Sequence, residues 1–533
     1  TINLTAAAAV VADSGPESDE GAFTVGANAP VSFDKIESTT VNGVAPGSSL
    51  TVNGMNQDDV ITLIGNGTDD FSVSVDAGPA TQYNNFGAVT LNGMSGSDRF
   101  DIDVNVLTST AITINGQSPS TSGDSVTVTG RAGAADNAVF TPTGADSGML
   151  AIAGLVAGNS IVLNSVESLD YNGESENESL TVLGTAGADT IVHTPGSTVD
   201  SGRVAVNSLL AIGYNNVGAA GSVTIDGQGG FDGVVAFGTS GYDFMTVDAT
   251  TGTVRLNDSA GSHVPLLRTD AAGESLLLEG LDGDDDFTIN LPQSYAFIGV
   301  AGDNSGGDDQ LTINNQSGAL DQFTVVPSAF GSPRYSGTIS ANATTVQYLG
   351  VGHIRLHGNA ADGDDLSVFD VGLGDNHWSV KAGPNGDLIQ IDDRESIEYT
   401  SIDAVSVVNV ATSSDVFGIE PTSLSNYASF TVTGDGNDTL HLIGTDNADT
   451  TSQVASMAYT VNGKRIDWTA SSISTLKLDG GDRADTFTVD LATLDAGVSD
   501  VEVAGGESSA SGATTADILN VNVAASVRVT QST

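Results

Sequence analysis

Short runs of alternating apolar and polar residues recur along the whole chain. Clear examples are RVAVNS (203–208), SVTIDG (222–227), TVRLND (253–258) and STLKLDG (474–480). In each run Val, Leu or Ile takes every second position, and Gly, Asn, Asp or Ser closes the run. This alternation is typical of a strand with one buried face, because successive side chains of a strand point to opposite sides. The spacing leaves little room for helices, so we predict an all-β chain.

Two phrases recur with nearly the same period. GTAGAD (184–189) returns as GTSGYD (238–243), and a looser copy, GRAGAAD, begins at residue 130, so the starts lie 54 residues apart twice running. A second phrase has its glycine at Gly173, then at Gly227 and at Gly280. In each phrase a turn rich in Gly, Asp or Asn runs into a β-prone segment. Such internal periodicity indicates an array of repeats.

A 54-residue unit with about five or six strands is compatible with two folds. One is a right-handed parallel β-helix, or β-solenoid, in which each unit supplies two coils of roughly 27 residues with three strands each. The other is a set of tandem β-sandwich domains or a propeller. We favour the solenoid, because stacking explains why similar residues recur at similar places.

The repeated phrases occur with different regularity along the chain, and their distribution suggests four segments. Residues 1–45 lack the phrases and are expected to form an N-terminal cap or assembly segment, with residues 1–11 as a candidate contact with another copy. Residues 46–291 form the regular β-repeat array. Residues 292–430 are expected to be an irregular β-region with insertions at 332–340 and 375–388. Residues 431–533 are read as C-terminal β-repeats.

The chain is strongly acidic, with 67 Asp and Glu against 15 Lys and Arg and a net charge of −52. Binding to nucleic acid needs basic patches, so this class of partner is excluded, and anionic membrane surfaces are disfavoured. No segment is apolar and long enough to insert into a membrane. The absence of cysteine excludes disulfides, thiolate metal sites and a cysteine nucleophile. We expect a secreted chain, extracellular or on the cell surface, whose signal peptide is absent from this sequence.

The acidic turns contain the most specific motif. VTGDGNDTLHL (432–442) closely resembles the calcium-binding nonapeptide GGxGxDxUx of RTX (repeat-in-toxin) proteins, in which U is apolar. Gly434, Gly436 and Asp438 match the pattern, Leu440 takes the apolar position, and Asp435 stands where the second glycine is usual. The segments LEGLDGDDDFTIN (278–290) and LDGGDRADTFTV (478–489) match in part.

The resemblance implies calcium at these turns. Inward-pointing carbonyls and Asp carboxylates together supply the six to eight hard oxygen ligands that Ca²⁺ takes. Adjacent acids also repel one another unless a cation lies between them. The copies lie about forty residues apart, whereas RTX sites are built by tandem nonapeptides, so the turns are RTX-like rather than an RTX roll. The alternative is that Asp and Gly are simply good turn residues.

The following residues are the candidate metal ligands: Asp98, Asp189, Asp243, Asp282, Asp284, Asp285, Asp286, Asp308, Asp309, Asp364, Asp365, Asp435, Asp438, Asp449 and Asp485.

The sequence contains little that is typical of catalysis. The acids fall in repeated turns, whereas a catalytic carboxylate pair would be a singular feature. No nucleophile elbow, P-loop or HExxH motif is present. His353 and His357 are four residues apart in a predicted strand, where this spacing does not suit a shared zinc ion. We predict that the protein is not an enzyme.

The chain resembles the large, acidic, Gly/Asp-rich repeat proteins of bacterial cell surfaces, particularly those of planctomycetes. The phrases GTAGADTIV, DGDDDFTIN and GDGNDTLHL carry the resemblance. It implies secretion, calcium dependence and a structural role. The leading hypothesis is an extracellular structural protein that self-assembles, as a homo-oligomer or polymer, into a fibre, surface layer or matrix. The alternatives are a calcium-dependent adhesin stalk or carbohydrate-binding module that recognises a polysaccharide or cell surface, and a β-helical polysaccharide-active enzyme.

Overall fold

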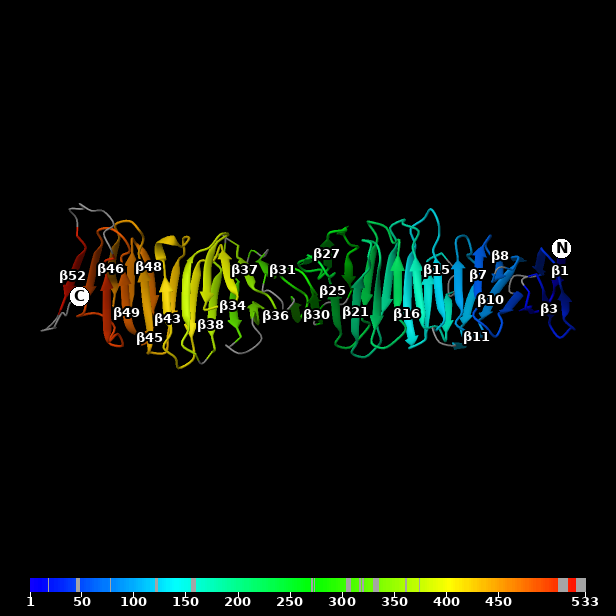
Figure 1. The fold of residues 1–533 in the computed structure, drawn as a ribbon, viewed down its shortest axis with the longest axis horizontal. Helices are drawn as coiled ribbons and strands as arrows, with labels where there is room; N and C mark the ends of the chain where they lie inside the picture. The colour runs from blue at the N-terminus through cyan, green and yellow to red at the C-terminus, as the bar shows by residue number, and fades with distance from the viewer. Residues whose placement is uncertain are drawn as a thin grey trace. The chain divides into compact units, whose positions relative to one another are not determined.

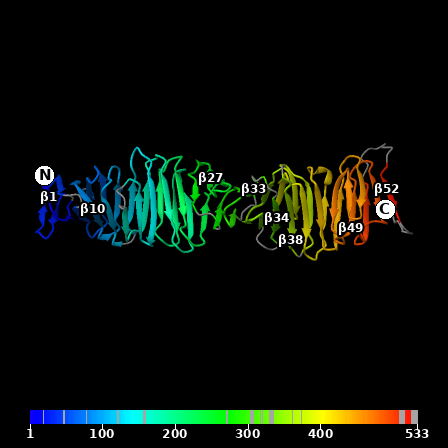
Figure 2. The same ribbon diagram turned by 180° about the vertical axis from the view of Figure 1, so that it is seen from behind.

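A computed structural model describes residues 1–17, 19–44, 48–76, 78–119, 123–154, 160–269, 272, 274–302, 308–315, 318, 321–328, 335–359, 362–372, 374–506 and 516–523. It divides into two compact units, residues 1–239 with 251–277 and residues 240–250 with 278–533. The division passes through β30 (Ser275–Glu279). Strands lie side by side through each unit (Figure 1, and from behind in Figure 2).

Each unit contains two sheets, which we call sheet A and sheet B, and neighbouring strands are given below in the order in which they pair. In the first unit sheet A comprises β1 (Ile2–Ala6), β5 (Thr39–Gly43), β9 (Thr81–Asn84), β8 (Phe71–Val75), β7 (Val60–Gly65), β12 (Arg99–Asp103), β15 (Ser125–Thr129), β19 (Ser168–Asn172), β23 (Ile212–Asn215), β22 (Gly202–Val206), β21 (Thr190–Pro195) and β25 (Gly233–Phe237). Sheet B comprises β4 (Val31–Phe33), β3 (Gly21–Val25), β2 (Val10–Ser14), β6 (Ser48–Asn53), β10 (Phe86–Asn92), β13 (Ala111–Asn115), β18 (Ile161–Asn164), β17 (Ser147–Ile152), β16 (Asn137–Gly144), β20 (Ser179–Leu183), β24 (Ser222–Asp226), β29 (Leu266–Arg268), β27 (Val254–Asp258) and β28 (Gly261–Ser262). A separate pair is formed by β11 (Ser95–Gly96) and β14 (Ser118–Pro119).

In the second unit sheet A comprises β32 (Phe297–Ala301), β36 (Thr344–Leu349), β35 (Ser336–Ala341), β34 (Gln322–Pro327), β38 (Asp365–Asp370), β42 (Ala404–Asn409), β44 (Ser429–Thr433), β48 (Lys464–Trp468), β47 (Ala458–Val461), β46 (Thr450–Ala455), β50 (Thr486–Asp490) and β52 (Ile518–Asn522). Sheet B comprises β26 (Phe244–Val247), β31 (Asp286–Leu291), β33 (Gln310–Asn315), β37 (His353–His357), β41 (Ser396–Thr400), β40 (Asp387–Ile391), β39 (His377–Ala382), β43 (Val416–Ile419), β45 (Asp438–Ile443), β49 (Ile473–Asp479) and β51 (Asp500–Ala504).

The strands confirm the predicted all-β repeat fold. In β24 Val223 and Ile225 are fully buried while the residues between them face outward, as the alternation in the sequence predicts. The core lies between the two sheets, where the rings of Phe71 in sheet A and Phe86 in sheet B are 6.3 Å apart. In the described part of the chain the helical content is one 3-10 turn, η1 (Pro421–Ser423). No helix there is long and apolar enough to cross a membrane.

Antiparallel meanders interrupt the parallel stacking. Consecutive coils pair in parallel, as β20 does with β24, but β16 turns back into β17 and then into β18. The outer strands of this meander pair in parallel with different coils, β18 with the preceding β13 and β16 with the following β20. Five further meanders have the same form: β7–β8–β9, β21–β22–β23, β34–β35–β36, β39–β40–β41 and β46–β47–β48.

The meanders give the coils two lengths and correct the expected coil size. Asp98 and Asp124 occupy equivalent places in coils 26 residues apart, whereas Asp189 and Asp232, separated by a meander, are 43 residues apart. The expectation of two 27-residue coils for each 54-residue period is therefore wrong. The phrases at residues 130 and 184 precede β16 and β21, which begin meanders in opposite sheets. Between these two phrases the period is the step from one meander to the next.

Segments expected to be irregular also form regular strands. In the 375–388 segment β39 and β40 are arms of a meander. In the 332–340 segment residues 335–340 belong to β35 and the turn before it, while residues 332–334 lie outside the described residues. At the N-terminus β1 pairs in parallel with β5.

Candidate functional site in the acidic turns

Each acidic turn connects a strand of one sheet to a strand of the other. β10 ends at Asn92, Gly93 follows it, and Asp98 directly precedes β12. Asp98 is 1% exposed, and its carboxylate folds back over Gly93. The same arrangement recurs in thirteen turns of the described residues: Gly54 with Asp59, Gly93 with Asp98, Gly116 with Asp124, Gly130 with Asp136, Gly173 with Glu178, Gly184 with Asp189, Gly280 with Asp285, Gly302 with Asp309, Gly358 with Asp364, Gly434 with Asp438, Gly444 with Asp449, Gly480 with Asp485, and Gly505 with Asp517.

The glycine of each pair is required by the carboxylate that covers it. A Cβ atom at Gly93 would lie 2.1 Å from Oδ2 of Asp98, and one at Gly480 would lie 2.2 Å from Oδ2 of Asp485. Contacts this short are overlaps, so any larger side chain would displace the carboxylate. The recurring Gly and Asp of the sequence are thus two halves of one packed unit.

The buried carboxylates bind backbone N–H groups of their own turn. Oδ2 of Asp189 accepts a hydrogen bond from the Thr185 N–H at 2.6 Å, and Oδ2 of Asp438 accepts one from the Asp435 N–H at 2.8 Å. Turns expose N–H groups that no strand can pair, and a short Asp side chain is well suited to bind them. The carboxylate therefore closes the turn from inside.

The same carboxylates also connect successive coils. The N–H of Asp59 donates to Oδ1 of Asp98 at 2.8 Å, and the N–H of Asp98 donates to Oδ1 of Asp124 at 2.7 Å. We call such a column of acidic side chains a carboxylate ladder. The ladders are Asp59–Asp98–Asp124–Glu167, Asp189–Asp232–Glu274, Asp243–Asp285–Asp309, Asp321–Asp364, Asp415–Asp438 and Asp449–Asp485–Asp517, and Asp415 also accepts the N–H of Asn376.

The fifteen predicted metal ligands fall into two groups. The first group is buried in the ladders and comprises Asp98, Asp189, Asp243, Asp285, Asp309, Asp364, Asp438, Asp449 and Asp485. The second group lies at or near the surface of the turns and comprises Asp282, Asp284, Asp286, Asp308, Asp365 and Asp435. The structure thus separates acids that are adjacent in the sequence. Asp285 points into the core, whereas Asp284 is exposed and Asp286 accepts a hydrogen bond from the Tyr242 hydroxyl at 2.6 Å.

Burial raises the pKa values of several ladder carboxylates. Loss of hydration raises the pKa of Asp98 to about 6; the N–H of Asp59 lowers it in part, and the charges of Asp124 and Asp59 raise it further. Burial likewise raises the pKa of Asp485 to about 6, with the carboxylates of Asp449 and Asp517 as neighbours. Burial also raises the pKa values of Asp59, Asp124, Asp415 and Asp438.

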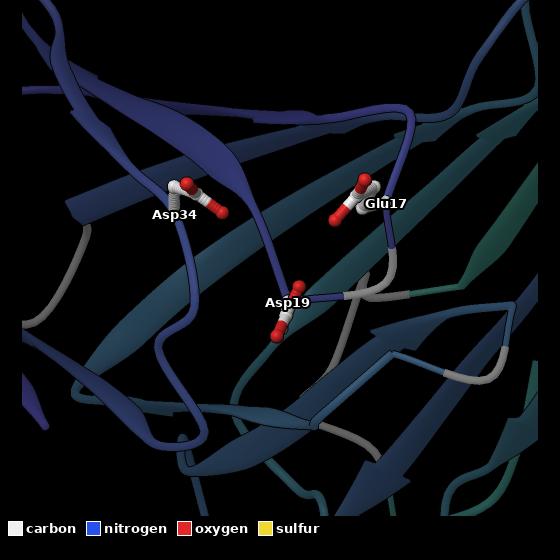
Figure 3. A group of neighbouring side chains, drawn as sticks. All are labelled: Glu17, Asp19 and Asp34. Atoms are coloured by element: carbon white, nitrogen blue, oxygen red, sulfur yellow. The ribbon is translucent and has the colours of Figure 1, made fainter.

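One acidic group was missed by the sequence analysis. Oxygen atoms of Glu17, Asp19 and Asp34 lie within 4.8 Å of one another (Figure 3), and among the described residues this is the group of three that gathers so closely. Glu17 and Asp19 come from the loop between β2 and β3, whereas Asp34 follows β4. The hairpin of β3 and β4 brings Asp34 back to the loop, and the sequence gives no sign of that pairing. Glu17 and Asp34 are exposed, and Asp19 is half-buried.

No protein-family model matches the sequence, and no curated protein matches it. The likeness to RTX-type proteins therefore rests on the turn motifs alone.

Proposed function

We propose that this protein is an extracellular structural protein whose coils assemble, copy to copy, into a fibre, surface layer or matrix, with calcium stabilising its acidic turns. The observation that supports this most directly is the turn in which a carboxylate covers a glycine, built thirteen times in the described residues, twelve times with Asp and once with Glu. A feature used so often belongs to the architecture of a protein, whereas a catalytic site is built once.

The use of the buried acids also supports a structural role. A general acid or base must reach a substrate, but most of the ladder carboxylates are buried, and they bind backbone N–H groups. Their bonds run within turns and from coil to coil, so their energetic effect is to hold the stack together. Repeat proteins of this kind derive stability from contacts between neighbouring repeats, which suits a passive, extended element.

Calcium would act on the second group of acids. Asp282 and Asp284 are exposed in the turn before β31, and Asp308 is exposed in the turn before β33. Their carboxylates are available to a hard cation that takes oxygen ligands, and calcium modules outside cells bind at about 0.1–1 mM. Cations there would reduce repulsion within a chain of charge −52 and between copies of it.

Assembly is tested by electron microscopy and light scattering of the purified chain over a range of protein concentrations, with calcium and with a chelator. We expect ordered filaments or sheets with calcium and their loss after chelation. Sodium chloride at matched ionic strength is the control, because simple screening would act equally in both salts. A chain that stays monomeric at high concentration with calcium present would contradict the proposal.

A further inference from the structure

The first strands of the two sheets in the first unit, and the last strands of the two sheets in the second, each have an unpaired edge. Within the described residues β1 pairs with β5 alone and β4 with β3 alone, while β52 pairs with β50 alone and β51 with β49 alone. Figure 1 labels β1 and β52 near the marked chain ends. An unpaired edge presents backbone N–H and C=O groups that can bond to a further strand.

The strands β2, β3 and β4 form a further meander, which is incomplete. In the six complete meanders the first strand pairs in parallel with the following coil, and the last strand pairs in parallel with the preceding coil. β2 likewise pairs in parallel with β6 of the following coil. β4 is the last strand of its meander, but within the described residues no preceding strand lies beside it. Its free edge is therefore where a parallel strand is expected.

A core position at the other end of the stack is uncovered. Leu519 of β52 is in register with Phe487 of β50, so both take the position that faces the core. Phe487 is 1% exposed, whereas Leu519 is 47% exposed. A further coil beyond β52 would bury Leu519, which is favourable for an apolar side chain.

The backbone groups of the two sheet A edges are complementary. The N–H of Ile2 donates at 2.9 Å to the residue before β5, so the backbone groups of Asn3 point to the opposite, free edge. The N–H of Ile518 donates at 2.7 Å to the residue before β50, so those of Leu519 point to the free edge of β52. A parallel pair needs this alternation on both strands.

Asparagine side chains on the outer face indicate the register. Nδ2 of Asn42 donates to Oδ1 of Asn3 at 2.9 Å, and Nδ2 of Asn84 donates to Oδ1 of Asn42 at 2.8 Å. The bonds of the asparagine column in sheet B run in the same direction, from each coil to the preceding one. Asn3 is the first member of its column, and β52 carries Asn520 at an outward position.

We propose that the C-terminal strands of a second copy of this chain stack on the N-terminal strands of the first, with β52 beside β1 and β51 beside β4, both in parallel. In the register that aligns Leu519 with Ile2, Nδ2 of Asn3 donates to Oδ1 of Asn520. The contact repeats the pairing between consecutive coils. It rests on the proposed function and names the surfaces through which copies assemble. Contacts between two different surfaces build filaments unless they close into rings, so a fibre is favoured.

Disulfide cross-linking tests the pairing, because the chain has no cysteine of its own. Full-length Asn3→Cys and Asn520→Cys are mixed in the calcium buffer of the assembly experiment, oxidised mildly and separated on non-reducing gels. Aligned residues of adjacent strands lie about 4.8 Å apart, a distance that a disulfide spans. Asn164→Cys, an exposed asparagine of β18, replaces Asn520→Cys in the control. We expect the mixed dimer to form at least about tenfold faster than the control dimer, because pairing raises the effective concentration of the two thiols.

A mixed dimer that forms no faster than the control would overturn the proposal, as would a preference for dimers of one variant alone, which indicates pairing of identical ends. If wild type still forms filaments or sheets in that case, the proposed function stands and copies meet elsewhere. If the cross-link forms but wild type gives no filaments or sheets, the pairing stands and the proposed function fails. Thr5→Cys with Asn522→Cys is a second pair in the same register, and it decides the outcome if the first variants do not fold.

Discussion

At the scale of single residues, the unit of this fold is a glycine and an aspartate that share one space. Gly93 has no side chain, and the carboxylate of Asp98 occupies the place where a Cβ would lie. The carboxylate is thereby held where its oxygen meets the N–H of Asp59 in the preceding coil. A mutation of either residue should therefore disturb a turn and a contact between coils together.

Replacing the glycine tests the shared space. We expect Gly93→Ala to lower the free energy of unfolding by about 1–3 kcal/mol, the usual cost of overpacking a filled site. Chemical denaturation followed by circular dichroism measures the change. Gly241→Ala is the control, because a Cβ there meets nothing within 4 Å. Equal stability of the two variants would show that the carboxylate moves aside freely.

Replacing the aspartate tests its hydrogen bonds. Asp189 accepts bonds from the Thr185 N–H at 2.6 Å and from Nδ2 of Asn207 at 2.6 Å, each at a different oxygen. Asp189→Asn retains the shape but leaves one acceptor, so we expect a loss of about 1–3 kcal/mol in the free energy of unfolding. The exposed Asp282→Asn should change it by less than about 0.5 kcal/mol. A loss at Asp282 that matches the loss at Asp189 would contradict a capping role for the buried group.

At the scale of elements, the molecule is built from short coils and from coils lengthened by a meander. Asp415 and Asp438 mark a short coil of 23 residues, and the next coil, which contains β46, β47 and β48, spans 36 residues between Thr439 and Thr475. Both kinds close with the same turn. The meander is thus an addition to a coil that is already complete.

This view predicts that a meander can be removed. Deleting residues 456–468 removes β47 and β48 and shortens the 36-residue coil to the 23 residues of its neighbour. We expect the chain to fold with a single transition but reduced stability, because the stacked rings of Tyr459 and Trp468 are lost. Circular dichroism and thermal melting measure the outcome. A chain without cooperative melting would show that the meander is essential to its coil.

The carboxylate ladders connect one coil to the next, and the raised pKa of a ladder carboxylate predicts an unusual dependence of folding stability on pH. Because the pKa of Asp98 in the fold is about 6 and its ordinary value is 3.8, the folded chain binds more protons between these pH values. This group's contribution therefore raises stability as pH falls through that window and lowers it as pH rises. The pKa of the buried His193 is lowered to about 4, so its contribution has the opposite sign.

The comparison of wild type with Asp98→Asn isolates the ladder, since His193 is common to both. We expect the melting temperature of calcium-free wild type to gain more than that of the variant when pH falls from about 7 to about 5. Thermal melts across this range provide the measurement. Parallel profiles would mean that Asp98 titrates in the fold as it does in the unfolded chain.

The sequence predicted the strands well because their burial is local. Residues 222–226 alternate in sequence and alternate in burial, with Val223 and Ile225 in the core. The meanders could not be predicted from local patterns. The sequences of β16 and β18 both read as ordinary strands, and only long-range pairing places β18 beside β13. The 54-residue period was visible, but its meaning depended on that pairing.

The sequence predicted which residue types form the candidate site, but it did not predict where the fold places each of them. Asp284, Asp285 and Asp286 appear in the sequence as one acidic cluster, but strand geometry buries the middle residue and leaves its neighbours outside. The position of Asp285 directly before β31 is the signal that could have separated it. Glu17 and Asp34 were not associated because the β3–β4 hairpin that joins them lies between.

At the scale of the whole molecule, charge is the dominant property. A net charge of −52 makes the compact state repel itself, and salt weakens that repulsion. We expect the melting temperature to rise when NaCl increases from about 0.05 M to about 0.5 M. At equal ionic strength CaCl₂ should raise it further, because specific sites add to screening. Identical curves in the two salts would leave screening as the whole effect and contradict calcium binding.

The self-contained turn also has an evolutionary consequence. Most coils carry their own glycine and aspartate and bond to the coils directly before and after them. A gene duplication that copies one whole coil, short or long, thus inserts a complete and correctly terminated unit without altering the others. A duplication that begins inside a turn separates the two partners and fails. Selection can therefore lengthen or shorten such a protein by recombination alone, and the surviving breakpoints are expected to preserve every glycine with its aspartate.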